Sequence, residues 1–231
     1  MERDLQFSGC TISANQCKCF EKLTEEELEL LEKNSVKVKY KRGEILFKQG
    51  GLVSQIMYME QGLAKVYLDN GKNSLVLKII PDGNFLGLAS VSEENNTYQY
   101  SVMTYVDSLV RQIDISFFRK LLNQNPGFTK EVIDILSTNS VLIYGRFFCL
   151  THKQAYGKLA DILLCITDQI FKTREFDLPL SRKELAELSG MSAETVVRML
   201  KKFHEEGLIQ MKGKSFKVLN YERLKMISET G

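Results

Sequence analysis

Residues 180–217 constrain the fold of this chain more than any other stretch. Ser181 is followed three residues later by Glu184, the spacing of a capping box that satisfies free backbone N–H groups at a helix start. A turn at residues 189–191 contains glycine, and Ser192 can cap a second helix over residues 193–206. Residues 208–211 and 215–219 then alternate as two strands around a basic Lys-Gly-Lys turn. This order predicts a winged helix-turn-helix.

The second helix of this motif carries a polar face suited to duplex DNA. Glu194, Val197 and Arg198 share one face with Lys201, so we expect the first three to contact bases: Arg pairs with guanine, and Glu accepts from cytosine. Residues 181–217 hold eight Lys and Arg against five acidic residues, in a chain of net charge +2. The alternative is a solvated helix with an i,i+4 Glu–Arg ion pair. The expected phosphate contacts are Ser181, Arg182, Ser192, Thr195, Lys201, Lys202, Lys212 and Lys214.

Composition bounds the class of protein. A chain of 231 residues that is 44% hydrophobic can form one large or two modest domains. No stretch approaches about 18 apolar residues, and the N-terminus lacks a signal-peptide pattern, so we expect a cytoplasmic protein with no membrane partner. Five cysteines are an odd number, and a cytosolic chain needs no disulfide staples. With two histidines and no catalytic motif, we do not expect an enzyme.

The chain is expected to be α+β and to contain four regions. Residues 1–20 form a cysteine-containing N-terminal segment, and residues 21–125 hold many short alternating runs between glycine-containing turns. Such runs predict an antiparallel β-roll, or jelly roll, which we interpret as a sensor domain. Residues 126–150 form a long helix, and residues 151–231 form the winged helix-turn-helix domain.

The long helix carries two apolar stripes, whereas one stripe would be enough to pack it on the β-roll. The second stripe favours a coiled-coil-like homodimer. The alternative is a helix buried between two domains of a monomer. The expected dimer-interface residues are Val132, Ile135, Leu136, Leu142, Ile143, Phe147 and Leu150.

The order of β-roll, long helix and winged helix-turn-helix resembles the Crp/Fnr superfamily of bacterial transcription regulators. The residues that carry the resemblance are 41–47 with Gly50, Gly62, 83–87, 180–186 and 190–198. The resemblance implies that Glu194 and Arg198 read a TGA core in each half of a palindrome. Ala193 is similar to the Fnr type and favours a TTGA-like half-site, but Val197 departs from it and leaves the outer bases open. A two-fold dimer would place its recognition helices about 34 Å apart.

The resemblance also points to an effector pocket in the β-roll. Cyclic-nucleotide-binding relatives place a Gly-Glu pair and an Arg-Ser pair around the nucleotide, and here those positions hold Gly87, Leu88, Tyr98 and Gln99. The loss of the Glu carboxylate and the Arg guanidinium makes cyclic AMP an unexpected ligand, since each charged hydrogen bond contributes about 1.5–3 kcal/mol. A vestigial roll without an effector is an alternative.

The N-terminal cysteines suggest another signal. Fnr-like oxygen sensors hold an iron–sulfur cluster on N-terminal cysteines and one cysteine of the β-roll, and Cys10, Cys17 and Cys19 are the candidate ligands here. Their spacing departs from the family pattern, and the β-roll position holds Arg111. Inert or redox-active thiols, zinc, and haem for sensing nitric oxide stay open. Whether the regulator activates, with RNA polymerase as a partner, or represses is open too, as are its effector and its target genes.

Overall fold

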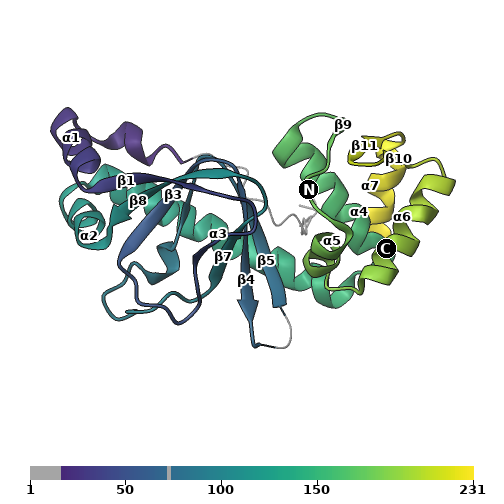
Figure 1. Ribbon diagram of the computed structural model, residues 1–231, viewed down its shortest axis with the longest axis horizontal. Coiled ribbons are helices and arrows are strands. Elements are labelled where there is room, and N and C mark those ends of the chain that lie inside the picture. Colours follow the sequence, from purple (N-terminus) through teal and green to yellow (C-terminus); the bar gives the residue numbers. More distant parts are fainter. Residues whose placement is uncertain (1–16, 72–73) are drawn as a thin grey trace, which may run out of the picture. The chain divides into compact units, whose positions relative to one another are not determined.

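The computed structural model describes residues 17–71 and 74–231 (Figure 1). Cys10 lies outside the described residues. The chain divides into two compact units, with the division inside the long helix between Ser140 and Val141. One unit holds most of the β-roll and the long helix up to Ser140, and the other holds Leu75–Lys78 of the β-roll together with Val141–Gly231, which include the helix-turn-helix. Both the α+β class and the predicted architecture are confirmed.

Two four-stranded antiparallel sheets form the β-roll. One sheet has the strand order β1-β8-β3-β6, with β1 (Ser35–Tyr40), β3 (Gln55–Gln61), β6 (Asn84–Leu86) and β8 (Ser108–Asp114). The other has the order β2-β7-β4-β5, with β2 (Ile45–Phe47), β4 (Leu63–Asp69), β5 (Ser74–Pro81) and β7 (Ser101–Thr104). Seven of these strands match short apolar or alternating runs in the sequence, whereas β6 was not predicted.

Short helices flank the β-roll, and the two α-helices among them each begin at a capping residue. The 3-10 turn η1 (Cys19–Lys22) precedes α1 (Glu25–Lys33), where Thr24 and Glu27 form a capping box. The helix α2 (Ile115–Gln124) begins at Asp114, whose carboxylate accepts from the N–H of Phe117 at 2.9 Å. These helices cover a core that contains Phe85, Phe118 and Phe128, whose rings meet edge to face at 5.4 Å in each of two successive contacts.

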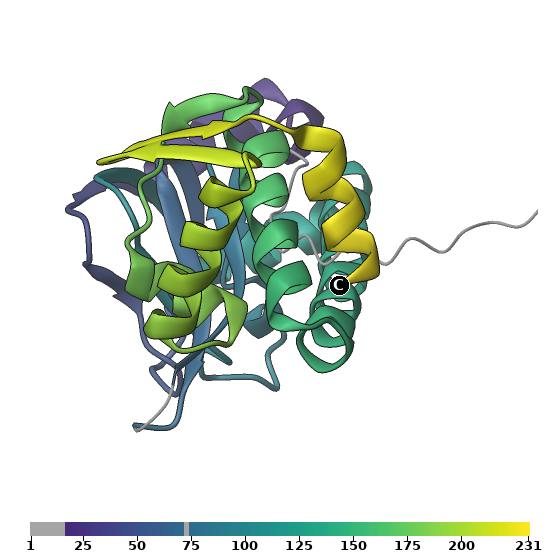
Figure 2. The same ribbon diagram turned by 90° about the vertical axis from the view of Figure 1, so that its right-hand side faces the viewer.

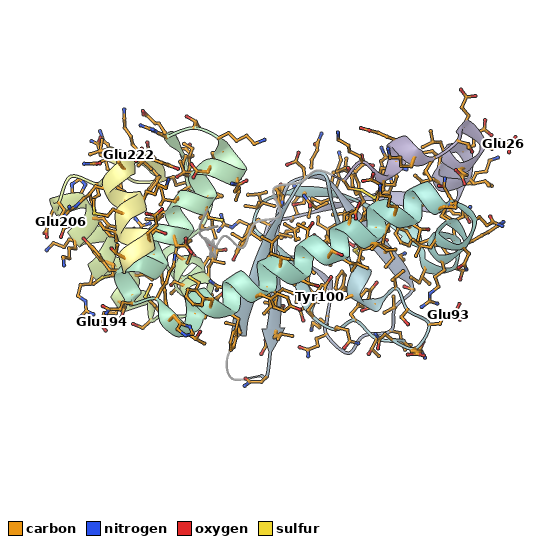
Figure 3. The ribbon with its side chains drawn as sticks, turned by 180° about the vertical axis from the view of Figure 1, so that it is seen from behind. Glu26, Glu93, Tyr100, Glu194, Glu206 and Glu222 are labelled. Carbon is orange, nitrogen blue, oxygen red and sulfur yellow. A yellow bond between two sulfur atoms is a disulfide. The ribbon has the colours of Figure 1, made fainter. Side chains whose placement is uncertain are left out.

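The long helix α3 (Pro126–His152) is continuous over 27 residues (Figure 3). Asn125 caps it by accepting from the N–H of Phe128 at 2.9 Å, and proline at the first helical position loses no hydrogen bond there. Within the described residues, α3 is the helix whose length and apolar composition would allow it to cross a membrane, a test that core helices of soluble proteins also pass.

The two ends of α3 differ in what covers their apolar side chains. Val132 is 2% exposed and lies in the β-roll core, with Ile135 and Leu136 packed against that core. The prediction that Val132 faces a partner is therefore corrected, because its side chain is already buried by its own chain. Further along, Ile143 and Phe147 are 45% and 68% exposed.

The second unit is built from helices and a three-stranded sheet (Figure 2). Its sheet has the order β10-β11-β9, with β9 (Glu175–Asp177), β10 (Ile209–Lys212) and β11 (Ser215–Val218). Its helices are α4 (Ala155–Cys165), which continues into the π-helical turn η3 (Ile166–Phe171), then α5 (Arg182–Ser189), α6 (Ala193–Glu205) and α7 (Tyr221–Thr230). Sequence patterns missed β9, which is three residues long, and α7, although Asn220 caps α7 and Leu224 anchors it.

Candidate nucleic-acid interface

The helix-turn-helix consists of α5 and α6, and local hydrogen bonds hold its two helix starts. Ser181 accepts from the N–H of Glu184 at 3.2 Å, and Glu184 accepts in return from the N–H of Ser181 at 2.6 Å. Ser192 accepts from the N–H of Thr195 at 3.1 Å. Gly190 ends α5 at a φ of +64°, where a side chain would be strained. All three predicted signals are therefore confirmed as the residues that begin or end these helices.

The two faces of α6 differ sharply in exposure. Val196, Leu200 and Phe203 are at most 5% exposed and anchor the helix in the core of the unit. On the other side, Glu194, Arg198 and Lys201 are exposed, and Val197 is 50% exposed (Glu194 is labelled in Figure 3). These three side chains suit contact with base edges: a guanidinium can donate to guanine, a carboxylate can accept from cytosine, and an aliphatic side chain can pack on the methyl group of thymine.

Within the described part of the chain, no ion pair joins Glu194 to Arg198, so the pair expected for a merely solvated helix is not formed. Both groups are exposed and can turn toward a ligand. Lys201 and Lys202 instead face Glu205 and Glu206 at 3.7 and 3.8 Å. Such exposed i,i+4 pairs contribute only about 0.3–0.5 kcal/mol each, so phosphates can displace them.

The hairpin β10–β11 supplies a second group of cations. Gly213 turns the chain between the two strands at a φ of +63°, with the exposed Lys212 and Lys214 on either side of it. Phe216 is buried against the ring of Phe176 at 5.1 Å, which holds the hairpin on β9. Arg182, at the start of α5, is half-buried, and this burial lowers its pKa. The remaining predicted phosphate contacts Ser181, Ser192 and Thr195 lie at helix starts, where free N–H groups favour anions.

The predicted effector pocket in the β-roll is filled by the chain's own aromatic side chains. The ring of Tyr98 stacks on Phe47 with centroids 3.9 Å apart, and its hydroxyl donates to the carbonyl of Gln55 at 2.7 Å. The N–H of Gly87 donates to the hydroxyl of Tyr100 at 3.0 Å, and burial of that hydroxyl raises the pKa of Tyr100 to about 12 (Figure 3). Here Tyr100, a residue that sequence analysis missed, binds the backbone amide.

The other two predicted pocket residues differ in exposure. Leu88 is 3% exposed and belongs to the β-roll core, whereas Gln99 is exposed. Tyr98 itself is 5% exposed. No described residue of this pocket offers a positive charge to a cyclic phosphate. The residues present therefore do not fit a cyclic nucleotide held in the usual manner.

Truncation of Tyr98 tests whether its ring fills this pocket. We expect Tyr98→Ala to lower the free energy of unfolding by about 3–5 kcal/mol, because it removes a stacked, buried ring. Tyr98→Phe keeps the ring, loses only the hydrogen bond to Gln55, and should cost about 1 kcal/mol. Urea denaturation of both variants measures the difference. A Tyr98→Ala variant as stable as the parent would contradict a filled pocket.

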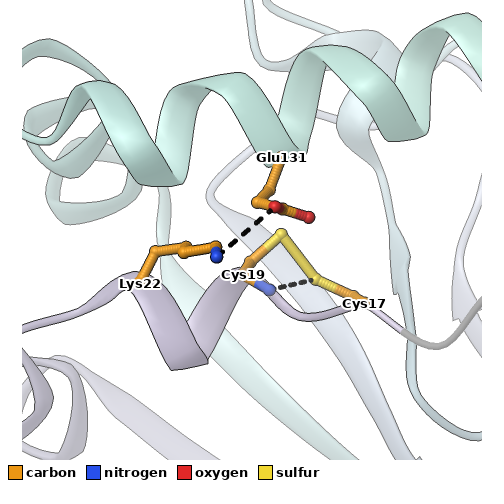
Figure 4. The surroundings of a disulfide bond; sticks show 4 residues. All are labelled: Cys17, Cys19, Lys22 and Glu131. Atoms are coloured by element: carbon orange, nitrogen blue, oxygen red, sulfur yellow. Dashed lines mark hydrogen bonds and ion pairs between the residues drawn. A yellow bond between two sulfur atoms is a disulfide. The ribbon is translucent and has the colours of Figure 1, made fainter.

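The described cysteines do not assemble a metal site. Cys17 and Cys19 form a disulfide next to the ion pair of Lys22 with Glu131 at 3.9 Å (Figure 4). No group of three His, Cys, Asp or Glu side chains placed to hold a metal occurs among the described residues. Cys149 is buried, and its thiol donates to Asp161 at 3.3 Å. Burial raises the pKa of Cys149 to about 11, which makes it an unreactive core thiol.

Comparisons with known proteins agree with this geometry. A model described as a cyclic nucleotide-binding domain matches residues 37–125, and one described as a Crp-like helix-turn-helix domain matches residues 157–227. The transcriptional activator protein anr of Pseudomonas aeruginosa is 25% identical over 186 residues, which cover 78% of this chain and 75% of that protein. The fumarate and nitrate reduction regulatory protein of Escherichia coli is 22% identical over 238 residues, covering 98% of this chain and 94% of that protein.

Solved structures share the fold. FixK2 from Bradyrhizobium japonicum superimposes with a TM-score of 0.77 at 18% identity, covering 85% of this chain and 98% of that chain. A CooA mutant from Carboxydothermus hydrogenoformans has a TM-score of 0.74 at 19% identity, covering 94% of this chain and 99% of that chain. At these identities the likeness extends to the architecture alone.

Proposed function

The chain belongs to the Crp/Fnr family of transcription regulators, and we propose that it is a cytoplasmic homodimer that binds a palindromic DNA site. Its relatives are transcription regulators, and its helix-turn-helix is a DNA-binding domain. The observation that carries the proposal is the exposed face of α6, where Glu194, Val197 and Arg198 stand together without an ion pair between the two charged groups. Enzymatic activity is not part of this proposal.

The uncovered apolar side chains of α3 support the dimer. Val141, Tyr144 and Phe147 are each at least 66% exposed, and Ile143 is 45% exposed. Contiguous apolar surface of this kind is unfavourable in water and marks a surface that a partner covers. A second copy of α3 would meet the same residues across a two-fold axis, and two-fold dimers are the commonest oligomers. The proposed interface is therefore Leu142, Ile143, Phe147 and Leu150, joined by Val141 and Tyr144, with Ile135 and Leu136 at its β-roll end.

A binding titration tests the proposed DNA site. The probe is a duplex with two inverted TTGA half-sites whose centres lie one helical turn apart, and the competitor is a scrambled duplex of equal length. We expect preference for the palindrome and a steep loss of affinity as salt rises, because the lysines of α6 and the hairpin release counterions from phosphates. A surface that instead contacts a protein predicts no salt-dependent binding to either duplex.

The second part of the proposal concerns the signal that the β-roll senses. Because its nucleotide pocket is filled, the β-roll either binds an effector elsewhere or binds none. An iron–sulfur cluster is disfavoured, because Arg111, at the β-roll position, lies between carboxylates and no three His, Cys, Asp or Glu side chains of the described residues are placed to hold a metal. Haem has no histidine available in the β-roll, since His152 and His204 lie in α3 and α6. Contact with RNA polymerase is proposed only for an activator.

An absorbance spectrum of protein purified without oxygen tests the cofactor alternatives. We expect no visible absorption band, because no three possible ligands of the described residues lie together to hold a metal and neither histidine lies in the β-roll. Bound iron and acid-labile sulfide are measured on the same sample as a control. A cluster band with matching iron would overturn the expectation and assign Cys10, Cys17 and Cys19 to the metal.

A further inference from the structure

A cavity of about 400 Å³ is lined by residues of η1, α1, β3 and β8, and none of these residues belongs to the filled nucleotide pocket. Apolar side chains from three elements form its walls: Phe20 of η1, Leu28 and Leu31 of α1, and Tyr58 of β3. Glu32, Glu60 and Arg111 form its polar part. The volume lies within the range of small-molecule sites. We propose that this cavity binds a small, uncharged amphipathic molecule and that it is the effector site of the regulator. The effector role rests on the function proposed above.

The polar part of the cavity is electrically balanced. Arg111 is 7% exposed; its Nε donates to Glu60 at 2.7 Å, and its Nη1 donates to Glu32 at 2.6 Å. Glu60 also meets Lys37 at 3.1 Å, so two cations face two carboxylates. Arg111 and Glu60 are largely buried and already paired, so an added charge beside them would lose water without gaining an unpaired counter-charge. The arrangement therefore selects an uncharged ligand.

Polar atoms in the cavity can still orient that ligand. Within the described part of the chain, the second terminal nitrogen of Arg111, Nη2, makes no hydrogen bond, and neither does the hydroxyl of Tyr58. A guanidinium N–H is a donor only, whereas a phenol both donates and accepts. A ligand with one polar group that donates and accepts, such as an amide, satisfies both atoms.

The apolar walls are aromatic on one side. Phe20 meets Tyr58 at 4.8 Å and Phe85 at 5.5 Å, in both cases edge to face. Phe20 is partly exposed, so a ligand in the cavity can contact its ring. A flat apolar group can pack against these rings in the same geometry. The walls thus favour an aromatic or short aliphatic body attached to the polar group.

Ring contacts connect this wall to the proposed dimer helix. From Phe20 the path continues through Phe85 to Phe118 at 5.4 Å and then to Phe128, in the first turn of α3, at a further 5.4 Å. A close-packed core transmits a displacement of one ring to the next. A ligand that binds better when Phe20 occupies one position would therefore bias the position of α3.

The test uses benzamide as the neutral probe, with benzoate and benzylammonium as charged probes of the same size, on the full chain with ¹³C-labelled leucine methyl groups. We expect benzamide to shift the Leu28 and Leu31 methyl signals and to bind about tenfold more tightly than either charged probe. Leu28→Trp should fill the cavity and weaken benzamide binding about tenfold or more. Leu30→Trp is the matched control, because Leu30 is exposed on the same helix and does not line the cavity.

Each outcome has one consequence. Unshifted methyl signals, equal binding of all three probes, or undiminished binding to Leu28→Trp would overturn the site. If saturating benzamide changes the DNA affinity of the parent by about threefold but not that of Leu28→Trp, the effector role is supported. An unchanged affinity overturns the effector role. Failure of the parent to bind DNA, with benzamide still bound, would overturn the proposed function and not the cavity.

Discussion

Replacing Arg198 with alanine should lower the affinity for the TTGA palindrome by about 1–3 kcal/mol, or roughly 5- to 150-fold. Arg198 is exposed on α6, pairs with no described residue, and carries the fork of donors that guanine accepts at two positions. Affinity for the scrambled duplex should fall much less, because the contact that Arg198→Ala removes is to a guanine of the palindrome. Fluorescence anisotropy at one fixed salt concentration measures both affinities.

The control for this prediction is Lys225→Ala, which removes an exposed cation from α7 rather than from the recognition helix. It has the same change in net charge, so it separates a base contact from general electrostatic attraction. We expect it to leave the preference for the palindrome unchanged. Equal losses in both variants, or an unchanged preference in Arg198→Ala, would show that the assigned face of α6 does not read bases.

Replacing Phe147 with glutamate should dissociate the dimer. Phe147 is 68% exposed in the single chain, so the folded protomer tolerates a carboxylate there, whereas a two-fold interface would bury the ring twice. Losing two buried phenylalanine rings costs about 3–6 kcal/mol per dimer, which weakens association on the order of a thousandfold. Sedimentation equilibrium over a range of protein concentrations measures it. The affinity for the palindrome should fall as well, because a single protomer contacts only one of the two half-sites.

Leu52→Glu provides the matched control, because Leu52 is 79% exposed in the β-roll and lies outside α3. It introduces the same charge in place of an exposed apolar side chain. We expect it to remain dimeric. If Phe147→Glu sediments as the parent does, α3 is not the interface, and its exposed apolar face would need another partner.

Patterns between near neighbours in the chain predicted most of the fold. The capping boxes at Thr24 and Ser181 and the cap at Ser192 involve residues three apart, so their hydrogen bonds follow from spacing alone. Seven strands of the β-roll could be read from short apolar or alternating runs, since the two faces of each strand differ in environment. The three-residue strands β6 and β9 were missed, and β2, which is equally short, was found only as an apolar run, because three positions are too few to show alternation.

The candidate DNA-contacting face could also be predicted, because a helix places residues three and four apart on one side whatever its surroundings. The burial of the opposite face by Val196, Leu200 and Phe203 agrees with that prediction. Contacts between distant residues were out of reach. Tyr98 and Phe47 are far apart in the sequence yet stack at 3.9 Å, and no local pattern shows that they fill the nucleotide pocket.

Two features of the long helix show where these limits lie. Its apolar stripes were readable from residue spacing, since helical periodicity is a local property. The assignment of each stripe was not, because it depends on which side chains the β-roll covers: Val132 is buried there, and Phe147 is not. Likewise, the winged helix-turn-helix between residues 180 and 217 follows from local capping and periodicity. The filled pocket behind Tyr98 and the cavity beside Arg111 exist only through packing between elements remote in the chain.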